Sequence, residues 1–165
     1  MTEKTSAPEA TPKATSQNKL PEQTRVRRDK LALMRELGQA YPNTWRSNAS
    51  LLDLHEQHDD ADKETLVDQG IEVFVAGRLL AHRVMGKSSF VKIQDKESDI
   101  QLFLNRDALG GAEVYNPTKK WDLGDIIGAK GILFFTKTGE LSVKVSHVEM
   151  ITKCLRPLPD KMQGL

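Results

Sequence analysis

Residues 71–95, IEVFVAGRLLAHRVMGKSSFVKIQD, restrict the possible folds of this 165-residue chain more than any other stretch. Apolar residues alternate with others from Ile71 through Val75, and the pattern resumes at Phe90 after a break around Gly86. Enrichment in β-branched and aromatic residues on both sides of a short Gly-Lys-Ser break is typical of a β-hairpin. We therefore expect two paired strands joined by a tight turn.

The charges of this hairpin all have one sign. Between residues 76 and 94 the charged side chains are Arg78, Arg83, Lys87 and Lys92. A strand surface that combines an aromatic ring with basic side chains can stack a base and hold a phosphate. Arg78, Arg83 and Lys87 are thus candidate RNA-binding residues, and solubilising surface charge is the alternative interpretation.

The remaining composition indicates a cytoplasmic protein without a membrane partner. The chain has one cysteine, Cys154, which excludes an intrachain disulfide and fits a reducing compartment. Its amino terminus lacks the apolar core of a secretory signal, and no apolar run is long enough to span a bilayer. Residues 1–23 are rich in Ser, Thr, Pro, Lys and Glu, which predicts a disordered tail.

Residues 24–70 are predicted to form a helical segment. Thr24 can cap a first helix that has Leu31, Met34 and Leu37 at helical spacing, and Gly38 ends it. Basic residues expected on another face of this helix are Arg25, Arg28 and Arg35. That face could contact phosphates, or it could simply be solvated.

A second helical region follows, opened by Ser50 with Asp53 as a near capping box and closed by Gly70 after a short turn over residues 65–69. Its surface is strongly acidic, so we expect it to point away from any polyanion. His55 and His58 lie among these carboxylates, but no complete ligand set is recognisable, and we assign no metal site.

Three further strands are predicted at residues 100–104, 126–136 and 141–148, with a short helix and loop before the second of them. Gly128 and Gly131 suggest a bend or bulge. The predicted fold is therefore mainly β with flanking helices, a five-stranded OB-fold barrel over residues 71–152. Its ligand face would be the second and third strands, flanked by loops 85–88 and 137–140. Residues 153–165, with Pro157 and Pro159, read as a linker toward a catalytic domain that this chain lacks.

Several motifs resemble one enzyme family. RVMGKSSF, KTGELS and LRPLPDK are similar to the amino-terminal region of bacterial-type class II lysine–tRNA ligases (lysyl-tRNA synthetases), and the likeness runs from about residue 25 to 165. The resemblance implies an OB-fold anticodon-binding domain preceded by helices. It also implies the tRNA-Lys anticodon stem-loop as partner and a homodimer in the full-length enzyme.

The resemblance also implies roles for three residues. Phe90 would stack on an anticodon base, Gln94 would hydrogen-bond a base edge, and Glu140 would touch a neighbouring base. A ring can stack on any base, and an amide can both donate and accept at a base edge. Alternation alone leaves open whether Phe90 is a core aromatic, whether Gln94 is a solvated strand end and whether Glu140 is only a turn residue.

The class II catalytic domain is not recognisable in this chain, nor is a phosphate-binding loop or a nucleophile–base pair. We therefore assign no catalytic residue and no cofactor to the chain, and expect it to be inactive alone. ATP and magnesium are implied for the full-length enzyme. The competing hypothesis is a freestanding OB-fold module for protein interaction or dimerisation.

Overall fold

The computed structural model describes residues 21–38, 41–42 and 45–158. No helix in these residues combines the length and apolarity needed to cross a membrane. Residues 1–20 of the predicted tail and residues 159–165 of the predicted linker lie outside the described residues. The other three tail residues are Pro21, which precedes the first helix, and Glu22 and Gln23, which belong to it. The elements in chain order are α1 (Glu22–Glu36), α2 (Leu51–His58), α3 (Lys63–Gln69), β1 (Glu72–Met85), β2 (Ser88–Gln94), β3 (Asp99–Asn105), α4 (Ala112–Thr118), β4 (Ile126–Phe135) and β5 (Leu141–Thr152).

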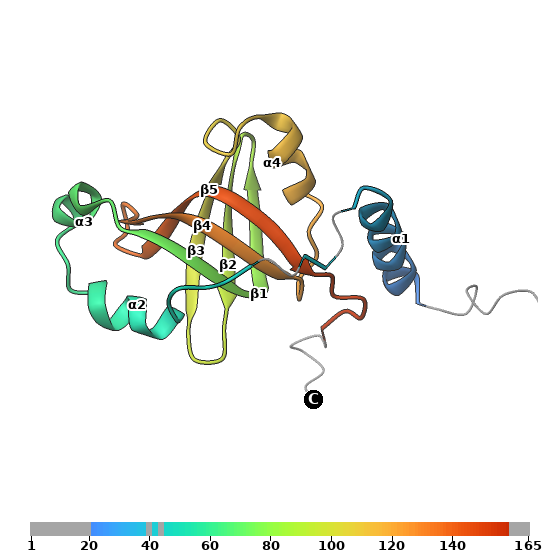
Figure 1. Ribbon diagram of the computed structural model, residues 1–165, viewed down its shortest axis with the longest axis horizontal. Coiled ribbons are helices and arrows are strands. Elements are labelled where there is room, and N and C mark those ends of the chain that lie inside the picture. The colour runs from blue at the N-terminus through green and yellow to red at the C-terminus, as the bar shows by residue number, and fades with distance from the viewer. Residues whose placement is uncertain (1–20, 39–40, 43–44, 159–165) are drawn as a thin grey trace, which may run out of the picture.

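The strands form a closed barrel in the order β1-β2-β3-β5-β4, with β4 pairing back onto β1 (Figure 1). All pairs are antiparallel except β3 with β5, which run parallel over a short register. The prediction of a five-stranded OB-fold barrel preceded by helices is confirmed. The strand that extends furthest beyond its predicted end is β5, which continues to Thr152.

The barrel interior is filled by alternate residues of each strand. In β2 the inward side chains are Ser89, Val91 and Ile93, all fully buried. Residues outside the strands also belong to the core: Leu51 and Leu54 from α2, Leu66 from α3, and Leu109 and Tyr115 from the β3–β4 connection. Figure 1 shows α4 and the α2–α3 pair at different places around the barrel. Full burial of one such Leu stabilises the fold by about 1.5–3 kcal/mol.

Two glycines of β4 permit close approaches that a side chain would block. The β4–β5 register shifts between Lys130 and Gly131, which confirms the predicted bulge. A Cβ on Gly131 would collide with the backbone carbonyl of Lys144, and one on Gly128 would lie 2.6 Å from the ring of Trp45. The bulge therefore bends β4 at Gly131. The absence of a side chain at Gly128 leaves room for the indole ring of Trp45 to pack against the backbone.

The second helical region agrees closely with its sequence signals. The side chain of Ser50 accepts a hydrogen bond from the backbone N–H of Asp53, as predicted for the start of α2. Asp62 caps α3, which begins two residues before the predicted turn. Gly70 ends α3 with a φ of 57°, a left-handed conformation that glycine adopts without steric strain.

The predicted start of α1 is wrong. The helix begins at Glu22 after Pro21, and Thr24 lies inside the helix, 7% exposed, without capping it. The extended backbone of Pro21 leads directly into the first turn, which leaves no capping position for Thr24. Leu31 is buried as predicted, but Leu37 is 62% exposed.

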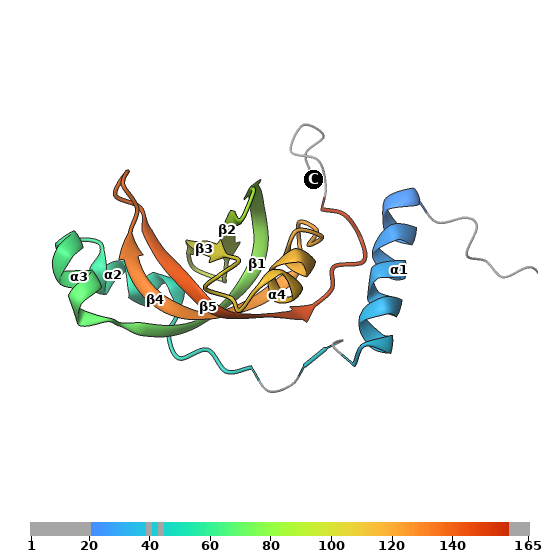
Figure 2. The same ribbon diagram turned by 90° about the horizontal axis from the view of Figure 1, so that it is seen from above.

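Polar contacts dock α1 against the barrel. The guanidinium of Arg27 donates hydrogen bonds to the carbonyls of Leu123 and Cys154, at 3.1 and 3.2 Å. Lys30 pairs with Asp122 at 2.9 Å. Figure 2 shows the segment after β5 running between the barrel and α1, where these contacts form. Arg27 and Lys30 therefore form contacts within the protein that connect α1 to the barrel.

A partly buried ion cluster anchors the same region. We call it the Lys153 cluster; its members are Lys30, Asp122, Asp125 and Lys153. The ammonium of Lys153 lies 2.6 Å from Asp122 and 2.8 Å from Asp125, and Asp125 is completely buried. Burial raises the pKa of Asp122, but hydrogen bonds and attraction from Lys153 and Lys30 outweigh it and leave that pKa below its ordinary value.

Candidate nucleic-acid interface

The structure places Phe90 on the outside of the barrel. Its neighbour Val91 points inward and is completely buried, whereas Phe90 is half-buried on the outer face of β2. The ring of Phe90 lies 5.2 Å from that of Phe103 on β3, and Phe103 lies 6.2 Å from Phe134 on β4. Three rings from three strands therefore form a continuous aromatic row.

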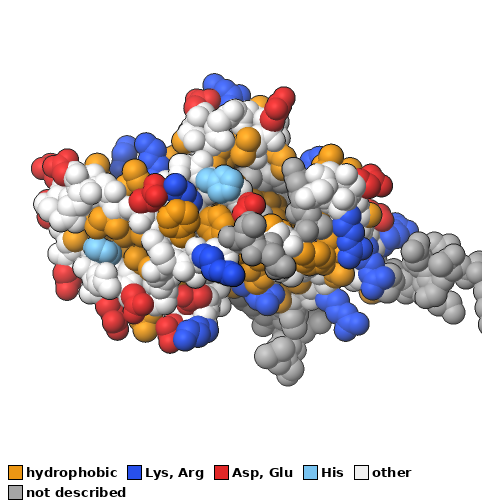
Figure 3. All heavy atoms as spheres, in the orientation of Figure 1, with side chains coloured by type: hydrophobic (Ala, Val, Ile, Leu, Met, Phe, Trp, Pro, Cys, Tyr) orange, Lys and Arg blue, Asp and Glu red, His pale blue; other side chains and the backbone are white. Residues whose placement is uncertain are grey.

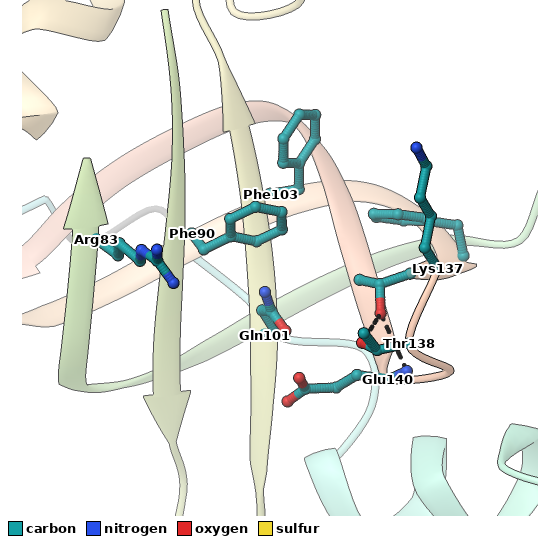
Figure 4. Close-up of a pocket in the computed structure, with 9 residues that line it drawn as sticks. Arg83, Phe90, Gln101, Phe103, Lys137, Thr138 and Glu140 are labelled. Atoms are coloured by element: carbon teal, nitrogen blue, oxygen red, sulfur yellow. Dashed lines mark hydrogen bonds between the residues drawn. The ribbon is translucent and has the colours of Figure 1, made fainter. Parts of the chain in front are cut away.

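This aromatic row is part of a groove of about 560 Å³ on the outer surface of the barrel (Figure 4). The residues that line the groove are Arg83, Phe90, Gln101, Phe103, Phe134, Thr136, Lys137, Thr138 and Glu140. They come from β1, β2, β3, β4 and the β4–β5 loop. The predicted ligand face and the 137–140 loop therefore meet in one concavity, while loop 85–88 contributes no lining residue.

The β4–β5 loop holds the backbone of Glu140 in a fixed position. The hydroxyl of Thr136 accepts a hydrogen bond from the backbone N–H of Glu140 at 3.1 Å and lies 3.0 Å from the hydroxyl of Thr138 (Figure 4). The backbone N–H of Thr136 donates to the carbonyl of Glu140 at 3.0 Å. Gly139 completes the turn with a φ of 86°. These hydrogen bonds hold the backbone of Glu140 and do not involve its side chain.

The amide that lines the groove is Gln101. It lies on β3 two residues before Phe103, and Figure 4 shows it between the rings and Glu140. Gln94, the amide predicted for this role, is exposed at the end of β2, in register with Arg78 and Asp99, and does not line the groove. One signal could have identified Gln101: in IQLFL it alternates outward together with Phe103.

The three basic candidates do not meet at one place. Arg83 lines the groove next to Phe90, its partner in the strand register. The guanidinium of Arg78 donates a hydrogen bond to the carbonyl of Gly124 at 2.9 Å, away from the groove. Lys87 is exposed in the β1–β2 turn, where its carbonyl accepts a hydrogen bond from the backbone of Arg106. Of the three, only Arg83 can contact a ligand in the groove directly.

His55 makes structural contacts. Its Nδ1 lies 2.9 Å from Asp59 and its Nε2 lies 2.7 Å from the carbonyl of Asp99. Burial lowers the pKa of His55, but the hydrogen bonds and negative charge at Asp59 and Asp99 outweigh it and raise the pKa above its ordinary value. Within residues 21–38, 41–42 and 45–158, no group of three or more His, Cys, Asp or Glu side chains could hold a metal ion.

Charge is unevenly distributed over the surface. Figure 3 shows basic side chains gathered over α1 and acidic side chains gathered over α2 and α3. On α1 the exposed basic residues are Arg25, Arg28 and Arg35, which confirms the face predicted for them. The acidic helices pack on the core through Leu51, Leu54 and Leu66, and neither helix contributes a residue to the groove.

Comparison with known proteins agrees with this geometry. A family of OB-fold nucleic acid binding domains matches residues 73–151, the barrel itself. Lysine–tRNA ligase of Idiomarina loihiensis is 48% identical over 165 residues, the whole of this chain. The chain carries the anticodon-binding OB-fold region of the lysine–tRNA ligase family.

Other lysine–tRNA ligases show the same relationship. The Histophilus somni protein is 51% identical over 85% of this chain, and the Psychromonas ingrahamii protein is 54% identical over 82%. The chain spans only 27–31% of the length of these three relatives. The resemblance to the amino-terminal part of the family is therefore confirmed for the binding region.

Proposed function

We propose that this chain recognises the anticodon stem-loop of tRNA-Lys through the groove. The observation that supports this most directly is the meeting of an aromatic row, an amide, a carboxylate and a guanidinium in one concavity. Single-stranded RNA loops are recognised by this combination, because unstacked bases can stack on rings and form hydrogen bonds along their edges.

Each groove residue has a distinct role in this proposal. Phe90 stacks on one anticodon base, an interaction of about 1–3 kcal/mol. The amide of Gln101 donates to and accepts from a base edge, which a cation cannot do. Glu140 accepts a hydrogen bond from a neighbouring base, and Arg83 contacts the backbone phosphate. Gln101 takes the role first predicted for Gln94, because Gln101 lines the groove.

We further propose that the chain acts within a homodimeric lysine–tRNA ligase in the cytoplasm. The names of the relatives support the ligase part of this proposal, and the single cysteine fits a reducing compartment such as the cytoplasm. The homodimer is what the family resemblance implies. ATP and magnesium would act in the ligase as a whole, while this chain supplies RNA recognition and no catalytic residue. Lysine-dependent exchange between pyrophosphate and ATP, assayed with this chain alone, should therefore be undetectable.

A titration with a lysine-anticodon stem-loop tests the proposal. The unaltered chain should bind this stem-loop more tightly than one with a changed anticodon, and affinity should fall with salt at a slope of roughly −0.7 per phosphate contact. Gln101→Ala should reduce the difference in affinity between the two stem-loops. The matched control Gln94→Ala should leave that difference unchanged.

Two outcomes would contradict the proposal. Equal affinity for both stem-loops would show that the groove does not read the anticodon. An intact thermal melt without RNA binding would favour the alternative of a protein-interaction module. If Gln94→Ala narrowed the preference and Gln101→Ala did not, the amide would have to be reassigned to the end of β2.

A further inference from the structure

We propose that Lys92 is a positioning residue for RNA recognition, which orients the Glu140 carboxylate and offsets its charge so that the groove can accept a base. This inference rests on the proposed anticodon function. It concerns a residue outside the aromatic row that does not itself line the groove.

Lys92 stands between two carboxylates. It lies on the outer face of β2, two residues after Phe90, in register with Gln101 on β3. Its Nζ is 3.3 Å from Oδ1 of Asp99 and 3.7 Å from Oε1 of Glu140. Of the two carboxylates, only that of Glu140 lines the groove. The ammonium therefore acts on the groove through Glu140.

A carboxylate in an RNA-binding groove is unfavourable unless its charge is offset. Phosphates approaching the groove would be repelled by Glu140 and by the nearby Asp99. Arg83 and Lys137 are the cations that line the groove, and neither forms an ion pair with Glu140 among the described contacts. Among the described ion pairs, Lys92 is the cation that pairs with Glu140, and it shares its charge with the closer Asp99.

The same contact orients the carboxylate. The backbone of Glu140 is fixed by Thr136, so the position of its oxygens depends on the side chain alone. Lys92 attracts Oε1, and Oε2 forms no hydrogen bond with any described residue. A carboxylate oxygen only accepts hydrogen bonds. The ligand chemistry that fits Oε2 is therefore a base edge that presents an N–H, either imino or amino.

The pair is suited to tighten when RNA binds. Both side chains are partly exposed, 39% for Lys92 and 46% for Glu140, so water screens their attraction in the free protein. A base covering the groove would exclude water and lower the local dielectric, which strengthens the attraction. The contact would then favour the bound arrangement over the free one.

A double-mutant cycle tests this role, with affinity for the lysine-anticodon stem-loop as the readout. Lys92→Met should weaken binding about fivefold in the presence of Glu140, and less than about twofold when combined with Glu140→Gln. Both Lys92→Met and Glu140→Gln should reduce discrimination at the same anticodon base. Lys96→Met is the charge-matched control, since Lys96 is 80% exposed and pairs with Glu97 outside the groove.

Three results would overturn the inference. Lys92→Met could lower the affinity for RNA equally in the unaltered chain and in the Glu140→Gln variant. That result would show that Lys92 contacts phosphate independently of Glu140. Unchanged binding of the Lys92→Met protein, or a loss matched by Lys96→Met, would remove any specific role. In each case the unaltered chain still binds the stem-loop, so the proposed function survives. Failure of the unaltered chain to bind would overturn both.

Discussion

Two lysines of this protein each lie between two carboxylates, in opposite environments. Lys153 is 1% exposed and contacts Asp122 and Asp125 at 2.6 and 2.8 Å. Lys92 is 39% exposed and contacts Asp99 and Glu140 at 3.3 and 3.7 Å. The buried arrangement connects parts of the fold, whereas the exposed one borders the groove. Burial therefore distinguishes a structural ion cluster from one available to a ligand.

The physical reason lies in solvation. A buried carboxylate such as Asp125 has no water to replace a lost partner, so Asp125 and Lys153 depend on each other. Water can replace either partner of Lys92, and such exposed pairs contribute about 0–1 kcal/mol to stability. The exposed pair can therefore change partners without unfolding the protein.

Lys153→Met should have the largest effect on stability. It leaves Asp125 buried without its cation and should lower the free energy of unfolding by about 3–5 kcal/mol, measured by chemical denaturation. The same substitution at Lys92 should change the free energy of unfolding by less than about 1 kcal/mol. Similar losses from the two variants would refute the distinction between the clusters.

Phe90→Ala should have the next largest effect, on RNA binding. Loss of the stacked ring should weaken stem-loop binding by about 1–3 kcal/mol, measured by titration. The loss of stability should include the contact with Phe103, about 0.5–1.5 kcal/mol, and the burial of about half a ring, and it should stay below the loss for a fully buried residue. Ile93→Ala is the control from the inner face of β2, where burial predicts a stability loss of about 2–5 kcal/mol. A collapsed melt for Phe90→Ala would assign Phe90 to the core.

The smallest effect concerns His55, which connects α2 to β3 through Asp99. Its pKa is raised in the folded state, so its protonated form stabilises the fold below the ordinary pKa of 6.5, and this contribution is lost as pH rises through the folded pKa. Because the site is partly exposed, the difference between the unaltered chain and His55→Gln should stay below about 1 kcal/mol. Denaturation at several pH values would measure it, and a difference that grows as pH rises would contradict this sign.

The sequence was sufficient to predict the barrel because each strand carries its inward and outward residues in alternation. The pattern around Val91 and Ile93 specifies which face is buried once the strand is placed in a closed sheet. The capping signals of α2 were equally local, since Ser50 and Asp53 contact each other directly. These features depend on neighbours that are close along the chain.

The docking of α1 and the amide of the groove were not predictable in the same way. Arg27 is buried because it reaches carbonyls of Leu123 and Cys154, which are remote in the sequence. Gln94 and Gln101 both face outward, and only the position of the β4–β5 loop decides which of them borders the groove. The resemblance implied this role for Gln94, whereas tertiary placement makes Gln101 the amide that lines the groove.

The short parallel pairing of β3 with β5 has a consequence for folding kinetics. Residues 101–103 pair with residues 142–144, so the connection between them includes α4 and all of β4. Bringing such distant segments together loses chain entropy before many contacts compensate for it, and pairings of this kind form slowly. The β1–β2 hairpin can form early because its pairing is local. The barrel should therefore close late, and the groove, whose walls come from both halves, should be among the last features to appear.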